Sequence, residues 1–377
     1  MLERRLLKNI DFSLLLGVLL VNAISLVFIG SATRHTPIGG DPLYYVKKQL
    51  VWQAVGLVMM VLTMSIDYSL LSRLARIIYA GNLGLLAAVL MAGRSALGAQ
   101  RWIAIGPFEL QPSEFAKIAL IISLAAYLAG RERPIKRPLD YAGAFIHIVF
   151  PLALVMRQPD LGTSLVFLAI LFGMLLIYGA PLCQLAIMVV GGLSVAIGAV
   201  MAHLKFGLPL PLKGYQLNRL IVFANPNIDP LGIGYHIIQS MIAIGSGRFF
   251  GRGIFAGTQN KLNFLPEQHT DFIFSVIGEE SGYIGALLVL GLYLLILYRG
   301  LKITLEAKDR FGSLVAAGVV SMWTFHILVN VGMTTGIMPV TGIPLPFMSY
   351  GGSALIANMI ALGLLLNIHM RRHKILF

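Results

Sequence analysis

Long apolar runs separated by short charged segments dominate the chain. A helix needs roughly 20 mostly apolar residues to cross about 30 Å of hydrocarbon. Ten runs approach or exceed that length, and they cover residues 11–31, 49–66, 77–93, 113–129, 142–156, 161–178, 182–203, 272–298, 313–335 and 350–369. The pattern therefore predicts an all-α polytopic membrane protein with ten transmembrane helices.

One connection is much longer than the others. Residues 204–271 form a segment of 68 residues between the seventh and eighth runs. Its stretch 237–246 is apolar but too short to span, which is more typical of an interfacial or re-entrant segment. We expect one integral-membrane domain over residues 1–377, with 204–271 as a large extracytoplasmic loop.

The distribution of Lys and Arg predicts the orientation. Cytoplasmic loops carry an excess of these residues, and the rule holds best for short loops. With the N-terminus placed inside, the inside segments hold sixteen Lys and Arg and the short outside loops hold six. An even number of spans then places both termini in the cytoplasm.

Composition excludes several protein classes. The chain is 57% hydrophobic and 12% charged, whereas soluble domains are about 45–50% apolar and about 25% charged. Soluble, disordered and fibrous classes are excluded, and the single Cys183 excludes an intrachain disulfide; we expect it to be buried. The net charge of +13 indicates that the protein binds anionic lipid headgroups and phosphate-bearing substrates rather than nucleic acid.

Charged residues at membrane depth are costly, so they are candidates for a functional site. Pro112 suits the first turn of the fourth span, and Glu114 and Lys117 share one face of it. In one interpretation, Glu114 compensates the dipole of the helix and Lys117 neutralises the charge of Glu114. The other is a charged cavity wall with Arg101 and Trp102 above it, where guanidinium and ammonium groups suit a pyrophosphate.

Two further carboxylates lie at predicted span boundaries. Asp160 falls in a turn between the fifth and sixth spans, where spacing favours a capping role. Thr270 is a fair N-cap for the eighth span, with Asp271 in its first turn. The alternative for Asp271 is a general base at the outer membrane face. Glu279 and Glu280 lie deeper in that span, where we expect structural pairing.

Other motifs are less specific. The stretch 245–259 interleaves glycines with Arg248 and Arg252, which suits either an anion-binding nest or a surface loop near headgroups. No metal site is predicted, because the histidines are scattered and the pair His369 and His373 lacks a third ligand. The sequence also predicts no cofactor, and it does not reveal whether a divalent cation assists.

Four segments together resemble the SEDS family (shape, elongation, division and sporulation). They are 111-QPSEFAK-117, 158-QPDLGTS-164, 265-LPEQHTDFIFSVIGEE-280 and 344-PLPFMSYGGSALIAN-358. The resemblance covers essentially the whole chain, and within the family it is strongest to the elongation member.

The resemblance implies a glycosyltransferase that polymerises the peptidoglycan precursor lipid II during cell elongation and rod-shape maintenance. The reaction would invert the donor's anomeric centre, form a β-1,4 linkage and release undecaprenyl pyrophosphate. Asp271 matches the family's essential aspartate. Arg101, Glu114, Lys117 and Asp160 match its polar cavity, and Trp102 lies beside them.

The resemblance also implies partners and a location. The expected partners are a class B penicillin-binding protein that supplies the transpeptidase, other proteins of the elongation complex, and membrane lipids. The expected location is the bacterial cytoplasmic membrane, with the active face outside. The alternatives are a lipid II flippase and a non-catalytic scaffold of the cell-wall machinery.

Overall fold

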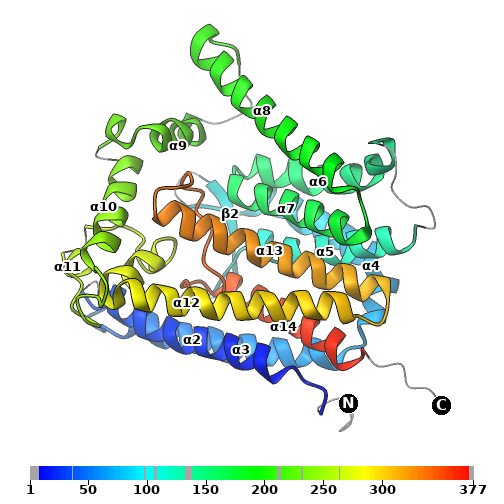
Figure 1. The fold of residues 1–377 in the computed structure, drawn as a ribbon, viewed down its shortest axis with the longest axis horizontal. Helices are drawn as coiled ribbons and strands as arrows, with labels where there is room; N and C mark the ends of the chain where they lie inside the picture. Colours follow the sequence, from blue (N-terminus) through cyan, green and yellow to red (C-terminus); the bar gives the residue numbers. More distant parts are fainter. Residues whose placement is uncertain are drawn as a thin grey trace.

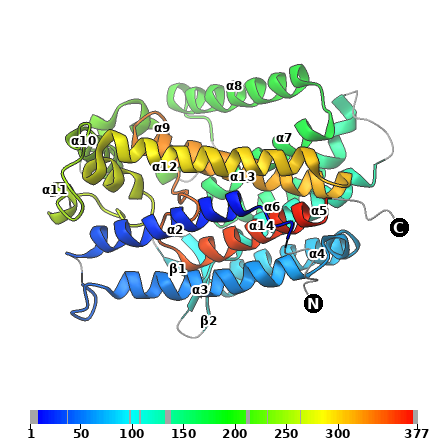
Figure 2. The ribbon, with the colours of Figure 1, turned by 60° about the horizontal axis from the view of Figure 1, so that its bottom comes forward.

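The fold is a bundle of long, roughly parallel and antiparallel helices (Figures 1 and 2). The computed structural model describes residues 8–35, 37–96, 99–105, 108–131, 138–209, 214–230, 232–262 and 264–372. Ten helices within them are long and apolar enough to cross a membrane. They are α2 (Phe12–Thr33), α3 (Tyr44–Ser65), α4 (Tyr68–Ala92), α5 (Pro112–Ala129), α6 (Ala142–Arg157), α7 (Leu161–Tyr178), α8 (Leu182–Phe206), α12 (Ile273–Glu306), α13 (Arg310–Thr334) and α14 (Gly352–Met370). All ten predicted spans are confirmed, and the protein is a multi-pass membrane protein. Most boundaries agree to within three residues, but α3 and α4 begin five and nine residues earlier than predicted, and α12 ends eight residues later.

Helix starts follow the local sequence signals. The carboxylate of Asp11 accepts the backbone N–H of Leu14 at 3.0 Å and caps α2. The carboxylate of Asp309 does the same for Gly312 at 2.8 Å and caps α13. Pro112 opens α5, as predicted, because the first turn of a helix needs no partner for the missing N–H. Short polar side chains thus set where the apolar runs begin to coil.

The centre of the bundle is formed by α5, α13 and α14. Most residues of these three helices are buried inside the protein. Helix α14 packs along α3, and α13 packs against α5, α7 and α12. The Trp323 side chain is fully buried between them and donates its indole N–H to Asn358 at 2.7 Å. The central helices therefore bring buried polar groups, among them Glu114, Lys117 and His326, into the middle of the bundle.

Helix α8 is the exception in the bundle. It projects away from the other helices in Figure 1 and lies along the top of the molecule in Figure 2, and Leu185 is its one buried residue. It contacts α7, and the Gln184 side chain near its start accepts the hydroxyl of Tyr141 at 2.7 Å. Cys183 is exposed, so the expectation that it is buried is wrong. The reason is that an apolar residue on a peripheral span faces outward rather than into the protein.

A small antiparallel sheet precedes α5 and was not predicted. It consists of β1 (Arg94–Ala96), β2 (Ala99–Ile105) and β3 (Phe108–Leu110), in that order. Strand β2 contacts α4 and α5, and β3 contacts α14. Because β2 carries Arg101 and Trp102, this sheet places both side chains over the start of α5.

The long connection between α8 and α12 is structured. It contains α9 (Gly214–Ala224), the 3₁₀ turn η2 (Pro226–Ile228), α10 (Ile233–Ser246) and the short α11 (Thr258–Lys261). A second 3₁₀ turn, η1 (Pro138–Tyr141), precedes α6. Helix α10 has 14 residues and is too short to span. Asp271 lies near the end of the connection, two residues before α12 begins at Ile273.

Residues 247–259, which we call the strap, wrap around α12 near its start. Backbone N–H groups of Arg252 and Gly253 bond the carbonyls of Glu279 and Glu280, each at 3.0 Å. Helix α12 bends there at Gly282, whose φ is +66°. A Cβ at this position would lie 2.2 Å from the Gly251 nitrogen, so only glycine fits.

The two predicted buried carboxylates hold this strap. Glu279 Oε1 accepts the backbone N–H groups of Thr258 at 2.6 Å and Gln259 at 2.9 Å. Glu280 accepts the N–H of Phe255 at 3.1 Å and the hydroxyl of Ser31. Their partners are therefore backbone and hydroxyl donors. Hydrogen bonds to a carboxylate satisfy its charge where water is scarce.

The two ends of the described chain lie at one end of the bundle. Arg299 of α12 forms an ion pair with Asp11 at 2.6 Å, and Arg372 lies 3.9 Å from Glu306. This arrangement agrees with termini on the same side. Which side that is stays a prediction, and part of its basis lies outside the described residues, namely Arg4, Arg5, Arg133, Lys136, Arg137 and Lys374. His373 also lies outside them.

Candidate active site

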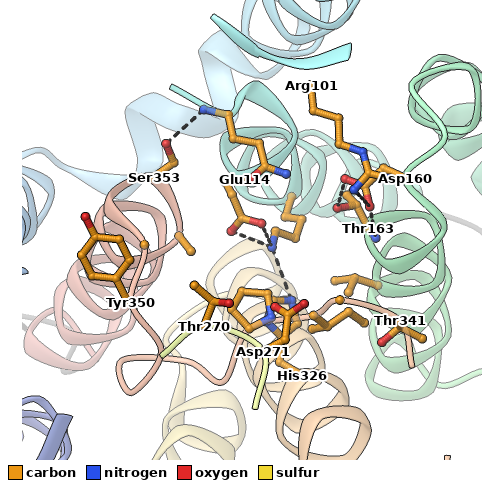
Figure 3. Close-up of a pocket in the computed structure, with 18 of the residues that line it drawn as sticks. Arg101, Glu114, Asp160, Thr163, Thr270, Asp271, His326, Thr341, Tyr350 and Ser353 are labelled. Atoms are coloured by element: carbon orange, nitrogen blue, oxygen red, sulfur yellow. Dashed lines mark hydrogen bonds and ion pairs between the residues drawn. The ribbon is translucent and has the colours of Figure 1, made fainter. Parts of the chain in front are cut away.

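A cavity of about 350 Å³ opens where α5, α7 and the segment before α14 meet. All six residues predicted to form the catalytic and substrate-binding site line this cavity, although they come from four separate segments. They are Arg101, Trp102, Glu114, Lys117, Asp160 and Asp271. Figure 3 shows Arg101, Glu114, Asp160 and Asp271 around one space. The cavity is the candidate active site.

One wall of the cavity carries a buried trio formed by Glu114, Lys117 and His326. The Lys117 ammonium donates to both oxygens of the Glu114 carboxylate, each at 2.8 Å. It also lies 3.4 Å from Nε2 of His326 on α13 (Figure 3). The three side chains are only 1–3% exposed. The predicted contact between Glu114 and Lys117 is thus confirmed, and it forms part of the cavity wall.

A second wall is built around Asp160. Its carboxylate accepts the backbone N–H of Thr163 at 3.2 Å and the Thr163 hydroxyl at 2.9 Å, which caps α7. The predicted capping role is therefore confirmed, and the residue also faces the cavity. A buried carboxylate held this way has a fixed position at the start of the helix.

Arg101 reaches this second wall from β2. Its Nη1 lies 3.9 Å from the Asp160 carboxylate, and its Nε donates to the carbonyl of Gln158 at 3.2 Å. Another nitrogen donates to the carbonyl of Pro159. The guanidinium is thus anchored to the turn between α6 and α7 while part of its side chain stays exposed in the cavity.

Asp271 lies just before α12 and is held by its backbone. The carbonyls of residues 269–271 accept hydrogen bonds from the Tyr350 N–H at 2.9 Å, the Ser349 hydroxyl at 2.7 Å and the Asn330 amide at 2.9 Å. Three successive carbonyls are therefore fixed by α13 and the segment before α14. This anchoring fixes the backbone position from which the carboxylate projects.

The predicted capping of α12 is wrong. The helix begins at Ile273, and its N-cap Phe272 makes no side-chain cap. The Thr270 hydroxyl bonds Glu267 instead, at 3.1 Å from its carboxylate. Asp271 therefore lies before the helix rather than in its first turn. The reason is that hydrogen bonds from neighbouring segments hold residues 269–271 in a turn.

The surroundings of Asp271 change its acidity. Burial raises the pKa of the Asp271 carboxyl to about 6, and the negative charge of Glu267 acts in the same direction. The charges of Arg219 and Arg101 oppose this shift. A carboxyl with a pKa near 6 is ionised at neutral pH and is a stronger base than an ordinary aspartate.

Gly342 allows the chain to pass close to this carboxylate. Its φ is +74°, and a Cβ there would lie 3.4 Å from Asp271 Oδ2 and 3.9 Å from Arg219 Nη1. A glycine is favoured because other residues are strained at this φ. The free space beside the carboxylate belongs to the cavity.

Sequence reasoning missed several residues of the cavity. Arg219 on α9 donates to the carbonyl of Thr341 at 3.1 Å, and Glu267, Tyr350 and Ser353 also line the wall. His326 carried a usable signal, because a histidine in the middle of an apolar span is expensive there. Arg219 and Glu267 lie in the long polar connection, and Tyr350 and Ser353 are uncharged residues at the start of the last span, so none of them carries that signal.

The glycine-rich strap does not contribute to this cavity. Arg252 bonds the carbonyl of Ser246 and the hydroxyl of Thr258, and neither Arg248 nor Arg252 lines the wall. The described residues contain no group of three or more His, Cys, Asp or Glu side chains that could hold a metal ion. That the protein has no metal site of its own stays a prediction from the sequence.

Known proteins resemble this chain over nearly its full length. The family described as FtsW/RodA/SpoVE, cell cycle proteins, matches residues 12–374. The peptidoglycan glycosyltransferase RodA of Treponema pallidum is 39% identical, covering 97% of this chain and 98% of its own. The peptidoglycan glycosyltransferase MrdB of Escherichia coli K12 is 40% identical, covering 97% and 94%.

Two solved structures resemble the fold. One is a chain from a structure that describes the structural coordination of polymerization and crosslinking by a peptidoglycan synthase complex. It is 34% identical with a TM-score of 0.80, and the match covers 97% of this chain and 99% of that one. The rod shape determining protein RodA of Thermus thermophilus has a TM-score of 0.70 and 32% identity, covering 97% and 98%. The chain belongs to the FtsW/RodA/SpoVE family.

Proposed function

We propose that the protein is a peptidoglycan glycosyltransferase that polymerises lipid II into glycan strands during cell elongation. The observation that carries this proposal is the cavity, which combines the carboxylate of Asp271 with the cations of Arg101 and Lys117. Transfer of a sugar from a pyrophosphate requires a base for the attacking hydroxyl and cations for the leaving pyrophosphate, both in the same cavity. The names of the similar glycosyltransferases support the same activity.

Asp271 is the general base in this proposal. The acceptor sugar's 4-hydroxyl attacks the donor's anomeric carbon, and Asp271 takes the hydroxyl proton. One displacement inverts the anomeric centre and forms a β-1,4 linkage, so a single base suffices. The pKa of about 6 supports this role because the carboxylate is ionised at pH 7 yet basic enough to accept a proton.

The cations stabilise the leaving group. Undecaprenyl pyrophosphate departs with negative charge developing on its bridging oxygen, and Arg101 and Lys117 lie on the walls where that charge can be met. The carboxylates of Glu114 and Asp160 hold these cations in place rather than contact the pyrophosphate themselves. Trp102 supplies an apolar wall beside them.

The proposed setting follows from topology and from the complex-forming relative. We infer that both termini are cytoplasmic and that the cavity opens to the outside. With this orientation the cytoplasmic segments hold sixteen Lys and Arg residues and the short outside loops hold six, as the positive-inside rule favours. A class B penicillin-binding protein would then crosslink the strands. The similarity to a structure from a peptidoglycan synthase complex supports that partner.

The purified protein, with and without such a partner, tests the proposal on lipid II in detergent and in liposomes. Synthesis of glycan chains is expected. Leaflet exchange of lipid II without chains would instead support the flippase alternative, and neither activity would support the scaffold. We favour the polymerase because the charged residues gather with a raised-pKa carboxylate in one cavity.

A further inference from the structure

The hydrogen-bond donors of Lys117 are all used within the protein. An ammonium group has three N–H donors and no acceptor. Two of them reach the two oxygens of Glu114, each at 2.8 Å, and the third faces Nε2 of His326 at 3.4 Å. Because the ammonium only donates, Nε2 must accept. His326 is therefore neutral, with its proton on Nδ1.

The three contacts differ in strength. The bonds to Glu114 are short and join opposite charges, which makes them roughly twice as strong as neutral ones. The contact with His326 is long for a hydrogen bond, and its acceptor is uncharged. A phosphate oxygen that enters the cavity must replace one of the three partners, and His326 is the partner that is easiest to displace.

The two anchors also come from different helices. Glu114 and Lys117 lie three residues apart on α5, so that pair by itself is local to one helix. His326 lies on α13 and is the contact that draws the ammonium across the cavity wall. Both Lys117 and His326 line the cavity.

We propose that His326 is a positioning residue that holds the third N–H of Lys117 in place until a phosphate oxygen of the substrate takes it over. This inference rests on the proposed function, and it assigns His326 a role in binding the pyrophosphate through Lys117. His326 acts as an acceptor and not as an acid or base.

The experiment measures the Kd for lipid II together with kcat and KM. His326→Leu removes the acceptor that holds the ammonium ready for the substrate, and kcat/KM should fall roughly two- to tenfold, as for the loss of one hydrogen bond of ordinary strength. His326→Gln retains an acceptor oxygen and should keep most of the activity. Thr324→Val, on the same helix but outside the cavity, is the matched control and should leave all three constants unchanged.

A double-mutant cycle separates positioning from packing. If His326 acts through Lys117, His326→Leu should not weaken lipid II binding further in a Lys117→Met background. The affinity remains measurable even where turnover is lost. Equal effects of the Leu and Gln variants, or additive effects in the cycle, would overturn the proposal.

These measurements also distinguish a failure of the proposed function from a failure of the role assigned to His326. Unchanged Kd and kcat/KM for Lys117→Met would remove Lys117 from the proposed active site. A weakened Lys117→Met with an unaffected His326→Leu would remove His326 alone. Should His326→Leu lose its thermal transition, the comparison of His326→Met with His326→Gln tests the same claim.

Discussion

At the scale of single residues, the site depends on how buried charges are satisfied. Glu114 and Asp160 are each fixed by donors within their own helix starts, and each faces a cation. Asp271 differs, because its backbone is anchored while its carboxyl has a raised pKa. A carboxylate that is costly to ionise in the folded state is typical of a group retained for chemistry.

The raised pKa predicts the pH dependence of the reaction. If Asp271 is the base, kcat/KM should fall about tenfold per pH unit below pH 6, because the protonated carboxyl cannot accept a proton. An unperturbed carboxyl would delay that loss until near pH 4. The rate of chain synthesis from lipid II between pH 4.5 and 8 measures this. An activity that stays constant down to pH 4.5 would contradict the assignment.

The same shift predicts a stability difference. Below pH 3.8 Asp271 is protonated whether the protein is folded or unfolded; between 3.8 and 6 only the unfolded chain ionises it. The folded state therefore loses stability across that window as pH rises, and the loss stays constant above it. Asp271→Asn should match wild-type Tm at low pH and exceed it at pH 7. A variant less stable at pH 7 would contradict this.

Gly342→Ala should impair the reaction without unfolding the protein. A Cβ there would lie beside the Asp271 carboxylate at a φ of +74°, which costs of order 1–2 kcal/mol for a non-glycine residue. We expect reduced kcat/KM together with a modest fall in Tm. Gly207→Ala, at a φ of +67° with open space, is the matched control. It should lower Tm similarly but leave the kinetics unchanged.

At the scale of elements, the spans were predictable and the small elements were not. A bilayer fixes the length of an apolar run, so ten runs could be located from hydrophobicity alone. The strands β1 and β3 have three residues each, which is too short for an alternating pattern to be visible. The contact between His326 and Lys117 joins residues 209 positions apart, and no local pattern encodes it.

The strap makes a prediction at this scale. Glu279→Ala removes an acceptor from two part-buried backbone N–H groups, and the loss of a hydrogen bond to a charged group costs about 1.5–3 kcal/mol. We expect a clear fall in Tm and faster proteolysis near residues 258–259. Glu306→Ala is the control, since its ion pairs are exposed and worth about 0–1 kcal/mol. Equal effects of the two substitutions would contradict the strap's structural role.

At the scale of the whole molecule, the bundle places the candidate site and the chain ends at opposite ends. Asp11, Arg299 and Arg372 gather where α2 starts and α12 and α14 finish. The cavity lies near the other end, where α5 and α12 begin. The charge asymmetry of the loops could predict that the chain ends and the cavity lie at opposite ends of the bundle. No local pattern could predict the shape of the cavity.

Labelling of single cysteines tests the orientation. Cys183 is exposed, so it must first be replaced by Ser. Asn227→Cys in the turn η2 should then react with a membrane-impermeant maleimide added to intact cells. Lys308→Cys, between α12 and α13, should react only after permeabilisation. The reverse pattern would invert the proposed topology and place the cavity on the cytoplasmic side.

The most direct measurement compares Asp271→Asn with the wild type in chain synthesis from lipid II. The amide cannot accept a proton, and loss of general-base help typically lowers the rate about 10²–10⁴-fold. The account predicts that the variant inserts, folds and binds lipid II, yet fails to make glycan chains at pH 7. Near-normal chain synthesis by a folded Asp271→Asn protein would contradict the assignment of Asp271 as the catalytic base.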